Sequence, residues 1–439
     1  MNRKSIVLIL LAVAAVSSGL EWTMSTPPSR CAARMCVDHA NQRVILFGGT
    51  TVYVNGGYFN DVSEIPLDNP GYYPWLPVKP SGAPPEKRAD VCLVYDPVGG
   101  RMIMFGGWSS TGSFLNDVWA LNLTPGSESW QQLTPAGSPP SGRAYAYAVY
   151  CPARRSVVVY GGYNGANVGD VWELKLDTLA WHPISASGAP SERRDGGAVY
   201  DSVGNRMLVF GGRTSGSFTN ELWALDLAPG GEHWFQLSPS GSMPSARAGF
   251  ASGSTEDGNK LYVSCGWDPS QFFSDLYVLD VASTTWTDLS PGGEKPLARR
   301  NVCGAWDPFA GNFFLYGGEC DAGAYLGDLF FADCGNAGTQ EPGWQQSGLS
   351  GPGLSVTAIS GGAVRIHCLV ARACALTVAV FDASGRKVRD LYVGRANSPG
   401  TWLEWDGKDG FGRTVAPGTY YCSIDAGSTV VSRKLVIAR

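Results

Sequence analysis

The chain has 439 residues and a formal net charge of −5, from 33 basic and 38 acidic side chains. Only 16% of the residues are charged, against about 25% in a typical soluble domain, and this acidic balance argues against a nucleic-acid partner, which needs a basic stripe. The 44% of apolar residues exclude disorder, and 57 glycines with 15 tryptophans are typical of many short strands joined by tight turns.

The chain begins with the features of a secretory signal peptide over residues 1–19. Two basic residues precede an apolar run at 6–16, and Ser17 and Gly19 fit the small-residue pattern of a cleavage site. A membrane-spanning helix needs about 20 apolar residues, and this run is shorter. We therefore expect cleavage rather than a membrane anchor. The sequence therefore predicts a secreted, periplasmic or cell-surface protein without a membrane span, in an oxidising compartment.

One pattern occurs six times between residues 20 and 348. Each copy has a Gly-Gly doublet after a short apolar run, although Cys265 replaces the first glycine of the fifth copy. The doublets begin at positions 48, 106, 161, 211, 265 and 317, which are 50 to 58 residues apart. An acidic-apolar-aromatic step follows each doublet, with Ser63 in place of the aromatic in the first copy. A tryptophan closes each copy: Trp75, Trp130, Trp181, Trp234, Trp286 and Trp344.

An arginine stands 18 residues before every doublet position. These repeat arginines are Arg30, Arg88, Arg143, Arg193, Arg247 and Arg299. A fixed separation tolerates no insertion, as expected when both ends belong to one two-stranded hairpin. The distance from the doublet to the acidic residue varies from 9 to 13, which indicates a loop that is free to diversify.

Each copy therefore contains four strands, and the doublet, the aromatic step and the tryptophan together resemble the Kelch repeat, a four-stranded propeller blade. The resemblance implies an all-β chain with a six-bladed Kelch-type β-propeller over residues 20–348. Trp22 is a seventh closing tryptophan, so either its strand or that of Trp344 completes the sixth blade. We favour the strand of Trp22, because propellers usually latch their two ends together in one blade.

A second domain follows a Gly/Pro/Ser linker at 349–353. Residues 354–439 alternate short strands with turns, as in 376–382 and 387–392, and predict a small Ig-like β-sandwich. Their pattern resembles the Ig-like domain of flagellar hook-capping proteins and the C-terminal sorting domains of type IX secretion substrates. The second resemblance implies contact with an outer-membrane secretion machinery; the alternative is a spacer that carries the propeller.

The sequence offers few groups for catalysis. His182 and His233 follow tryptophans on outer strands, so they do not converge as Kelch-type copper radical oxidases require. No metalloprotease, nucleophile-elbow or phosphate-loop motif occurs. Asp406 and Asp409 could attract a calcium ion, but Asx turns explain them better. We predict no cofactor and no metal.

Eleven cysteines in an exported chain predict disulfides with at least one thiol left over. Their pairing stays open, although Cys320 and Cys334 bracket one strand of the sixth copy. Cys92 and Cys303 each stand four residues after a repeat arginine, and we favour their interpretation as buried packing residues.

The repeat arginines allow two interpretations. The Kelch resemblance implies that they contact an acidic ligand at the pore mouth, where six of them would focus the field on an anion. Alternatively, each arginine bonds carbonyl groups of neighbouring loops and holds the blades together. Their regularity favours the structural role, because a binding site usually varies from blade to blade.

The residues directly after each doublet do vary, and they open on the same face as the arginines, here called the loop face. They are Thr50, Trp108, Tyr163, Arg213, Trp267 and Glu319. Further aromatics on the same loops are Phe114, Phe218, Phe272 and Tyr325. Such side chains either contact sugars or peptide side chains, or fold back to cap the blade cores.

Three functions remain open. The first is a secreted, non-catalytic propeller that binds a glycan or an extracellular protein through its loop face. The second is a sugar-modifying enzyme, since exported Kelch propellers include a sialic-acid mutarotase; it needs a carboxylate and a base on one sugar. The third is a passive surface scaffold that acts through its C-terminal domain.

Overall fold

Short β-strands make up nearly all of the regular structure in the computed structural model. It describes residues 27–51, 57–68, 73–290, 292–293, 295–334, 343–346, 353–358, 364–369, 374–382, 385–396, 400–425 and 430–437. The predicted signal peptide and Trp22 lie outside these ranges. Within them, the 3-10 helix η1 (Pro152–Arg154) is short, and no helix has the length and hydropathy to cross a membrane.

The first half of the repeat region forms three antiparallel sheets in chain order. Blade 1 contains β1 (Arg34–Asp38), β2 (Arg43–Phe47), β3 (Val62–Pro66) and β4 (Leu76–Val78). Blade 2 contains β6 (Cys92–Asp96), β7 (Arg101–Ser109), β8 (Phe114–Asn122) and β9 (Ser129–Leu133), with β5 (Arg88–Ala89) paired to β7. Blade 3 contains β10 (Tyr147–Cys151), β11 (Ser156–Tyr160), β12 (Val171–Lys175) and β13 (Ala180–Ile184).

The second half repeats this plan. Blade 4 contains β14 (Gly197–Asp201), β15 (Arg206–Phe210), β16 (Leu222–Asp226) and β17 (Trp234–Leu237). Blade 5 contains β19 (Ala251–Ser254), β20 (Lys260–Ser264), β21 (Leu276–Asp280) and β22 (Thr285–Asp288), with β18 (Ser240–Gly241). Blade 6 contains β25 (Cys303–Asp307), β26 (Asn312–Tyr316), β28 (Leu329–Asp333) and β29 (Gly343–Gln346), with β23 (Gly292–Gly293). A separate pair joins β24 (Arg299–Arg300) to β27 (Glu319–Cys320).

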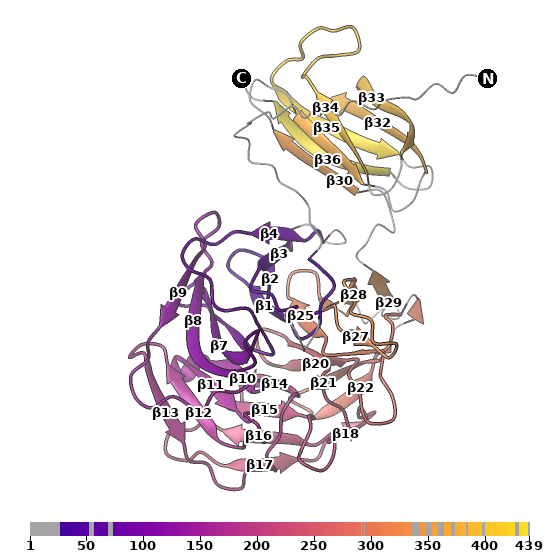
Figure 1. The fold of residues 1–439 in the computed structure, drawn as a ribbon. Helices are drawn as coiled ribbons and strands as arrows, with labels where there is room; N and C mark the ends of the chain where they lie inside the picture. Colours follow the sequence, from indigo (N-terminus) through magenta and orange to yellow (C-terminus); the bar gives the residue numbers. More distant parts are fainter. Residues whose placement is uncertain are drawn as a thin grey trace, which may run out of the picture.

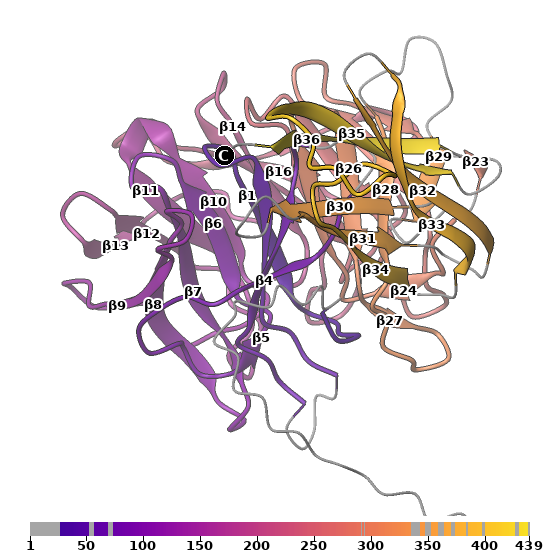
Figure 2. The same ribbon diagram turned by 90° about the horizontal axis from the view of Figure 1, so that it is seen from above.

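The six blades close into a ring (Figure 1). The first strand of each blade lies at the axis, where β1, β6, β10, β14, β19 and β25 contact one another in succession and β25 contacts β1; Figure 2 shows β6 and β10 side by side. These strands line a central channel of about 450 Å³. The second strands are buried along their whole length in blades 1, 3 and 6, because each sheet packs between two others. The all-β propeller prediction is confirmed.

The closing tryptophans hold neighbouring blades together. Each described one packs against the aromatic that precedes the doublet of the preceding blade, with ring centroids 4.7 to 5.3 Å apart. The pairs are Trp75 with Tyr316, Trp130 with Phe47, Trp181 with Phe105, Trp234 with Tyr160, and Trp286 with Phe210. The pair between blades 1 and 6 closes the ring.

The expectation that the strand of Trp22 completes the sixth blade is wrong. Strand β29, which contains Trp344, pairs with β28 as the fourth strand of blade 6. Blade 6 therefore takes its fourth strand from the segment of Trp344. Backbone hydrogen bonds join it to blade 1, from the Arg30 N–H to the Leu326 carbonyl at 2.9 Å and from the Gly318 N–H to the Arg30 carbonyl at 2.9 Å.

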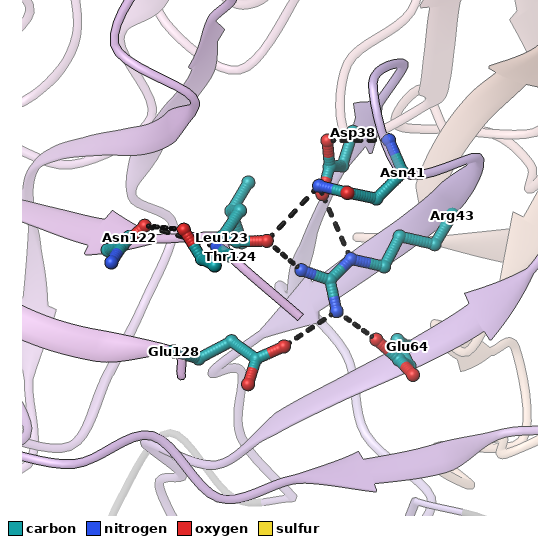
Figure 3. Close-up of polar contacts among 8 residues, drawn as sticks. All are labelled: Asp38, Asn41, Arg43, Glu64, Asn122, Leu123, Thr124 and Glu128. Atoms are coloured by element: carbon teal, nitrogen blue, oxygen red, sulfur yellow. Dashed lines mark hydrogen bonds and ion pairs between the residues drawn. The ribbon is translucent and has the colours of Figure 1, made fainter. Parts of the chain in front are cut away.

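On the face of the propeller opposite the loop face, the buried Arg43 joins blade 1 to blade 2 (Figure 3). Arg43 donates to Asp38 at 2.9 Å, to Glu64 at 2.5 Å and to Glu128 of blade 2 at 2.8 Å, and it also bonds the Leu123 carbonyl. Burial raises the pKa of Glu64 even though Arg43 opposes the shift. The geometry assigns this cluster to blade-to-blade cohesion.

The C-terminal segment forms two small sheets, drawn as a separate body in Figure 1. One contains β30 (Gly353–Ala358), β31 (Val364–Leu369) and β34 (Gly400–Trp405). The other contains β32 (Cys374–Asp382), β33 (Lys387–Ala396), β35 (Gly418–Asp425) and β36 (Val430–Ile437). Trp405 of the first sheet shares a core with Val378, Val380 and Cys422 of the second.

Seven of the described cysteines take part in no disulfide. Cys36, Cys92, Cys151, Cys265, Cys303, Cys320 and Cys334 are free thiols. Cys92 and Cys303 are buried on the inner strands, as expected of packing residues, and burial raises the pKa of each thiol to about 12. The disulfide prediction therefore has no support among these seven residues.

Candidate functional site at the loop face

The Gly-Gly doublet creates the turn from which the loop face is built. In blade 3 both glycines have left-handed backbone conformations, with φ of +66° at Gly161 and +106° at Gly162. A Cβ on Gly162 would lie 2.9 Å from the carbonyl oxygen of Ala144, so only glycine fits this close approach. Cys265 adopts the same conformation with φ of 63° in blade 5. The turn returns the chain towards the segment that follows the repeat arginine.

The repeat arginines lie inside the blades, each with at most 1% of its surface exposed. In blade 3, Arg143 donates to both carboxylate oxygens of Asp170 at 2.5 and 2.8 Å, to the Gly161 carbonyl at 3.0 Å and to Ser141. All five N–H donors of this guanidinium are used. The acidic partners in the six blades are Asp61, Asp117, Asp170, Glu221, Asp275 and Asp328.

This geometry explains two sequence features at once. The arginine joins the first-strand entrance, the doublet and the acidic residue that opens the third strand, which fixes the 18-residue spacing. Burial opposes ionisation of Asp170, but hydrogen bonds from Arg143 and Trp172 hold the pKa of this carboxyl below its usual value. The contacts favour the structural role; ligand contact by the repeat arginines stays a prediction.

A closed ring of hydrogen bonds surrounds the channel mouth. It consists of the residue two positions after each repeat arginine, and each N–H donates to the carbonyl of the equivalent residue in a neighbouring blade at 2.7 to 3.1 Å. All six have left-handed backbone conformations, with φ between 52° and 62°. We call them the mouth ring: Ala32, Asp90, Tyr145, Asp195, Gly249 and Asn301. The ring uses up backbone donors that would otherwise face the mouth.

The post-doublet residues lie just outside the mouth ring. Each pairs in antiparallel fashion with the residue that follows the repeat arginine. The pairs are Cys31–Thr50, Ala89–Trp108, Ala144–Tyr163, Arg194–Arg213, Ala248–Trp267 and Arg300–Glu319. The structure thus brings all the sequence-predicted post-doublet residues to one rim around the mouth.

Aromatic side chains connect neighbouring blades along this rim. Phe114 contacts Trp108 edge-to-face at a centroid distance of 4.4 Å and Tyr163 of the next blade at 5.5 Å. Trp267 contacts Phe218 at 4.8 Å and Phe272 at 6.3 Å. All six rings are half-buried, so they stabilise one another and still present surface to a ligand.

Four further arginines surround the mouth. Arg34 lies 3.7 Å from Asp90, and Arg300 pairs with Glu319 at 3.1 Å. Arg194 stacks on Tyr163 at 3.9 Å from the ring centroid and donates to the side-chain amide oxygen of Asn167 at 2.8 Å. Arg213 lies 5.6 Å from the Phe218 ring centroid. Among the described residues, neither Arg194 nor Arg213 has a carboxylate within 4 Å.

Asp195 of the mouth ring is a further carboxylate in this group of arginines, beside Asp90 and Glu319. It is half-buried at the end of the channel, and loss of hydration raises its pKa to about 6, although Arg34, Arg194, Arg300 and Arg213 all oppose the shift. A carboxyl that titrates near neutrality can exchange protons or respond to a bound charge.

The sequence prediction missed three residues of this site: Arg194, Asp195 and Asn167. The signal for Arg194 was present, because it follows a repeat arginine where three of the other blades have alanine. Asp409 was considered above as a possible calcium ligand. Its carboxylate accepts hydrogen bonds from the N–H groups of Phe411 and Arg413, as an Asx turn requires. In the described part of the chain, no group of three His, Cys, Asp or Glu side chains is arranged to hold a metal.

Comparison with known proteins finds relatives whose sequences match part of this chain. Human host cell factor 1 is 33% identical over 204 residues, which cover 42% of this chain and 10% of that protein. An F-box/kelch-repeat protein of Arabidopsis thaliana is 29% identical over 282 residues, 58% of this chain and 56% of that protein. The chain thus spans a tenth and slightly more than half of these two relatives.

The fold has a match among solved structures as well. The structure of YjhT aligns with a TM-score of 0.55 and 16% identity, over 73% of this chain and 98% of that one. The KLHDC2/KLHL20/DRC7 Kelch-repeats domain matches residues 7–200 and 127–318, which together cover most of the chain. The chain belongs to this family of Kelch-repeat propellers.

Proposed function

We propose that the protein is a secreted, non-catalytic Kelch propeller that binds a glycan or an extracellular protein through its loop face. The observation that carries this proposal is the rim itself, where half-buried aromatic rings and four arginines surround the channel mouth. The buried repeat arginines of the scaffold, in contrast, are paired with carboxylates. Rigid scaffolds that present variable aromatic loops commonly use them for recognition.

The proposal includes the two ends of the chain. Residues 1–19 support export, and cleavage there would release the propeller into the periplasm or the medium. The two C-terminal sheets with their shared core support an Ig-like sandwich, which would attach the propeller to a surface or present a sorting signal to an outer-membrane secretion machinery. Cell fractionation of the full chain and of a chain that ends at Ser350 tests this part, since loss of surface material in the shorter chain is expected.

Alanine at Trp108, Tyr163 or Trp267 tests the loop face. Each substitution should weaken ligand binding by roughly 2 kcal/mol or more, because aromatic anchors dominate hot spots, and should leave a cooperative melting transition. The measurement is a binding screen of polysaccharides and extracellular proteins against the wild type and the triple variant. Phe411→Ala, which removes an aromatic that is 86% exposed in the C-terminal segment, is the control. Equal binding by wild type and triple variant would remove the loop face as the site.

A second candidate, an enzyme that interconverts forms of a sugar, is favoured by Asp195. A carboxyl with a pKa of about 6 beside a group of arginines is suited to accept and return a proton. Exchange spectroscopy by NMR on free sialic acid and hexoses tests it. Acceleration that disappears in Asp195→Asn would favour the enzyme over the binding module.

A further inference from the structure

We propose that Arg194 and Arg213 of blade 4 form a subsite for the carboxylate of an acidic sugar unit, so that the ligand of the loop face is a uronic-acid-containing glycan. This inference rests on the proposed binding function and deepens it. It starts from the way in which one blade departs from the other five.

Arg194 and Arg213 are directly opposite each other across two antiparallel segments. The Arg194 N–H donates to the Arg213 carbonyl at 3.0 Å, and the Arg213 N–H donates to the Arg194 carbonyl at 2.8 Å. Side chains of directly opposed residues emerge on the same face, and like charges in this position are destabilising. The ligand-free protein therefore carries two positive side chains on one face of this bridge, with no opposite charge within the pair.

The equivalent pairs in the other blades avoid this arrangement. Four of them contain no charge, and the pair in blade 6 joins opposite charges, with the Arg300 guanidinium 3.1 Å from Glu319. Blade 4 alone lacks such compensation among the six described pairs. A bound oxyanion would supply the opposite charge that this pair itself lacks.

The Arg194 guanidinium is also held in place. The face of the Arg194 guanidinium lies on the Tyr163 ring, and one of its N–H groups donates to the side-chain amide oxygen of Asn167. The Asn167 amide in turn donates to the Arg213 carbonyl at 3.2 Å, and Asn167 is only 7% exposed. A guanidinium fixed by its face and one donor keeps other edge donors for a planar acceptor, and a carboxylate matches that fork.

The backbone N–H groups around the pair are already hydrogen-bonded, and this favours a sugar acid over an acidic peptide as the ligand. Extended peptides add main-chain hydrogen bonds to a free strand edge. Around the pair, the mouth ring occupies the N–H groups of Tyr145, Asp195 and Gly249, and Arg194 and Arg213 use theirs on each other. Recognition must therefore rely on side chains, and the neighbouring Tyr163 and Trp267 rings suit the apolar faces of sugars.

The test uses trigalacturonate, its uncharged methyl ester and a hexaglutamate peptide as probes, with calorimetric binding to the full chain. Wild type should bind the acid about 10-fold or more tightly than the ester, as expected for charged hydrogen bonds. Arg194→Ala and Arg213→Thr should reduce this preference to about twofold or less. Both substitutions introduce residues that other blades carry at the same position, so the fold should accept them. Arg101→Gln, which removes a positive charge in a hairpin on the opposite face, should retain the preference.

Arg213→Glu gives a second, independent readout. It reproduces the opposite-charge pair of blade 6 and should therefore raise the melting temperature without ligand while it abolishes acid-selective binding. A structural role for Arg213 would instead lower the melting temperature.

Three results would overturn the inference: no binding of trigalacturonate at millimolar concentration, equal affinity for acid and ester, or an acid preference that both arginine variants retain. Tighter binding of hexaglutamate than of trigalacturonate would also overturn it, in favour of an acidic protein ligand. The proposed function fails separately, when the triple aromatic variant binds every ligand as the wild type does.

Discussion

Two consecutive residues of blade 4 show how one residue type serves the interior of the blade and its rim differently. Arg193 is fully buried, and its guanidinium pairs with Glu221 at 2.7 Å. Arg194 is half-buried, stacks on Tyr163 of the neighbouring blade and has no carboxylate within 4 Å among the described residues. The interior position has an arginine in all six blades, whereas the rim position has one in only two.

The difference shows what repetition means in a propeller. A contact needed to build each blade must recur in each blade, so invariance among copies indicates stability. A ligand has no sixfold symmetry, so its contacts are found where one copy departs from the others. The interior arginines should therefore affect folding, and the rim residues should affect binding.

The largest effect is expected for Arg143→Ala. It removes the fork to Asp170 and leaves buried carbonyl groups and a carboxylate without their donor. We expect a loss of about 2–4 kcal/mol in the free energy of unfolding, near the lower limit for broken buried ion pairs because 44% of the Asp170 side chain is exposed. Chemical denaturation measures it, and Arg194→Ala is the matched control, with no loss expected.

The opposite result would remove the distinction between interior and rim arginines. If Arg143→Ala unfolds as the wild type does and instead weakens ligand binding in a salt-dependent way, the repeat arginines contact the ligand. The interior and the rim would then form one binding surface.

A smaller loss is expected for Gly212→Val. A Cβ at Gly212 would lie 2.1 Å from the Tyr147 hydroxyl and 2.6 Å from the Arg194 carbonyl oxygen, and its φ is +98°. We expect a destabilisation of about 2 kcal/mol, measured as a lower melting temperature. Gly216→Val, in the same loop but with no neighbouring atom within 4 Å, should melt like the wild type. Equal melting of the two variants would show that the doublet is not a structural requirement.

The sequence predicts the propeller well because its constraints are local and repeated. The spacing between Arg143 and Gly161 reflects one hydrogen bond, from the guanidinium to the carbonyl of that glycine, and this bond occurs at the same separation in five blades. The post-doublet residues are predictable as a rim for the same reason. Ring closure is not, because whether Trp22 or Trp344 completes blade 6 depends on contacts between distant segments.

The candidate site is only partly predictable. Arg213 is visible in the sequence as a variable position, but Arg194 becomes its partner only through an antiparallel bridge 19 residues away. The raised pKa of Asp195 depends on its place in the mouth ring, where hydrogen bonds from other blades hold it among four arginines. Such properties arise from the closed ring and have no local signal.

The smallest effect we predict concerns the charge of Asp195 at the rim. Its pKa is raised from 3.8 to about 6, so the carboxyl changes from mostly neutral to mostly ionised between pH 5 and 7.5. An ionised Asp195 repels a bound carboxylate, whereas Arg34, Arg194, Arg213 and Arg300 keep their charge throughout this range. Wild type should therefore bind trigalacturonate several-fold more tightly at pH 5 than at pH 7.5.

Asp195→Asn isolates this contribution from the other carboxylates at the mouth, Asp90 and Glu319. Asparagine tolerates the left-handed conformation, as Asn301 shows in the same ring with φ of 52°. The variant should bind the acid with nearly equal affinity at both pH values. Stability gives a second check: the raised pKa of Asp195 contributes stability below pH 4 that is lost as the pH rises through about 6, so the variant should lose less stability over that interval. A variant that keeps the full pH dependence of binding would assign it to Asp90 or Glu319, and Asp195 would then be a structural member of the mouth ring alone.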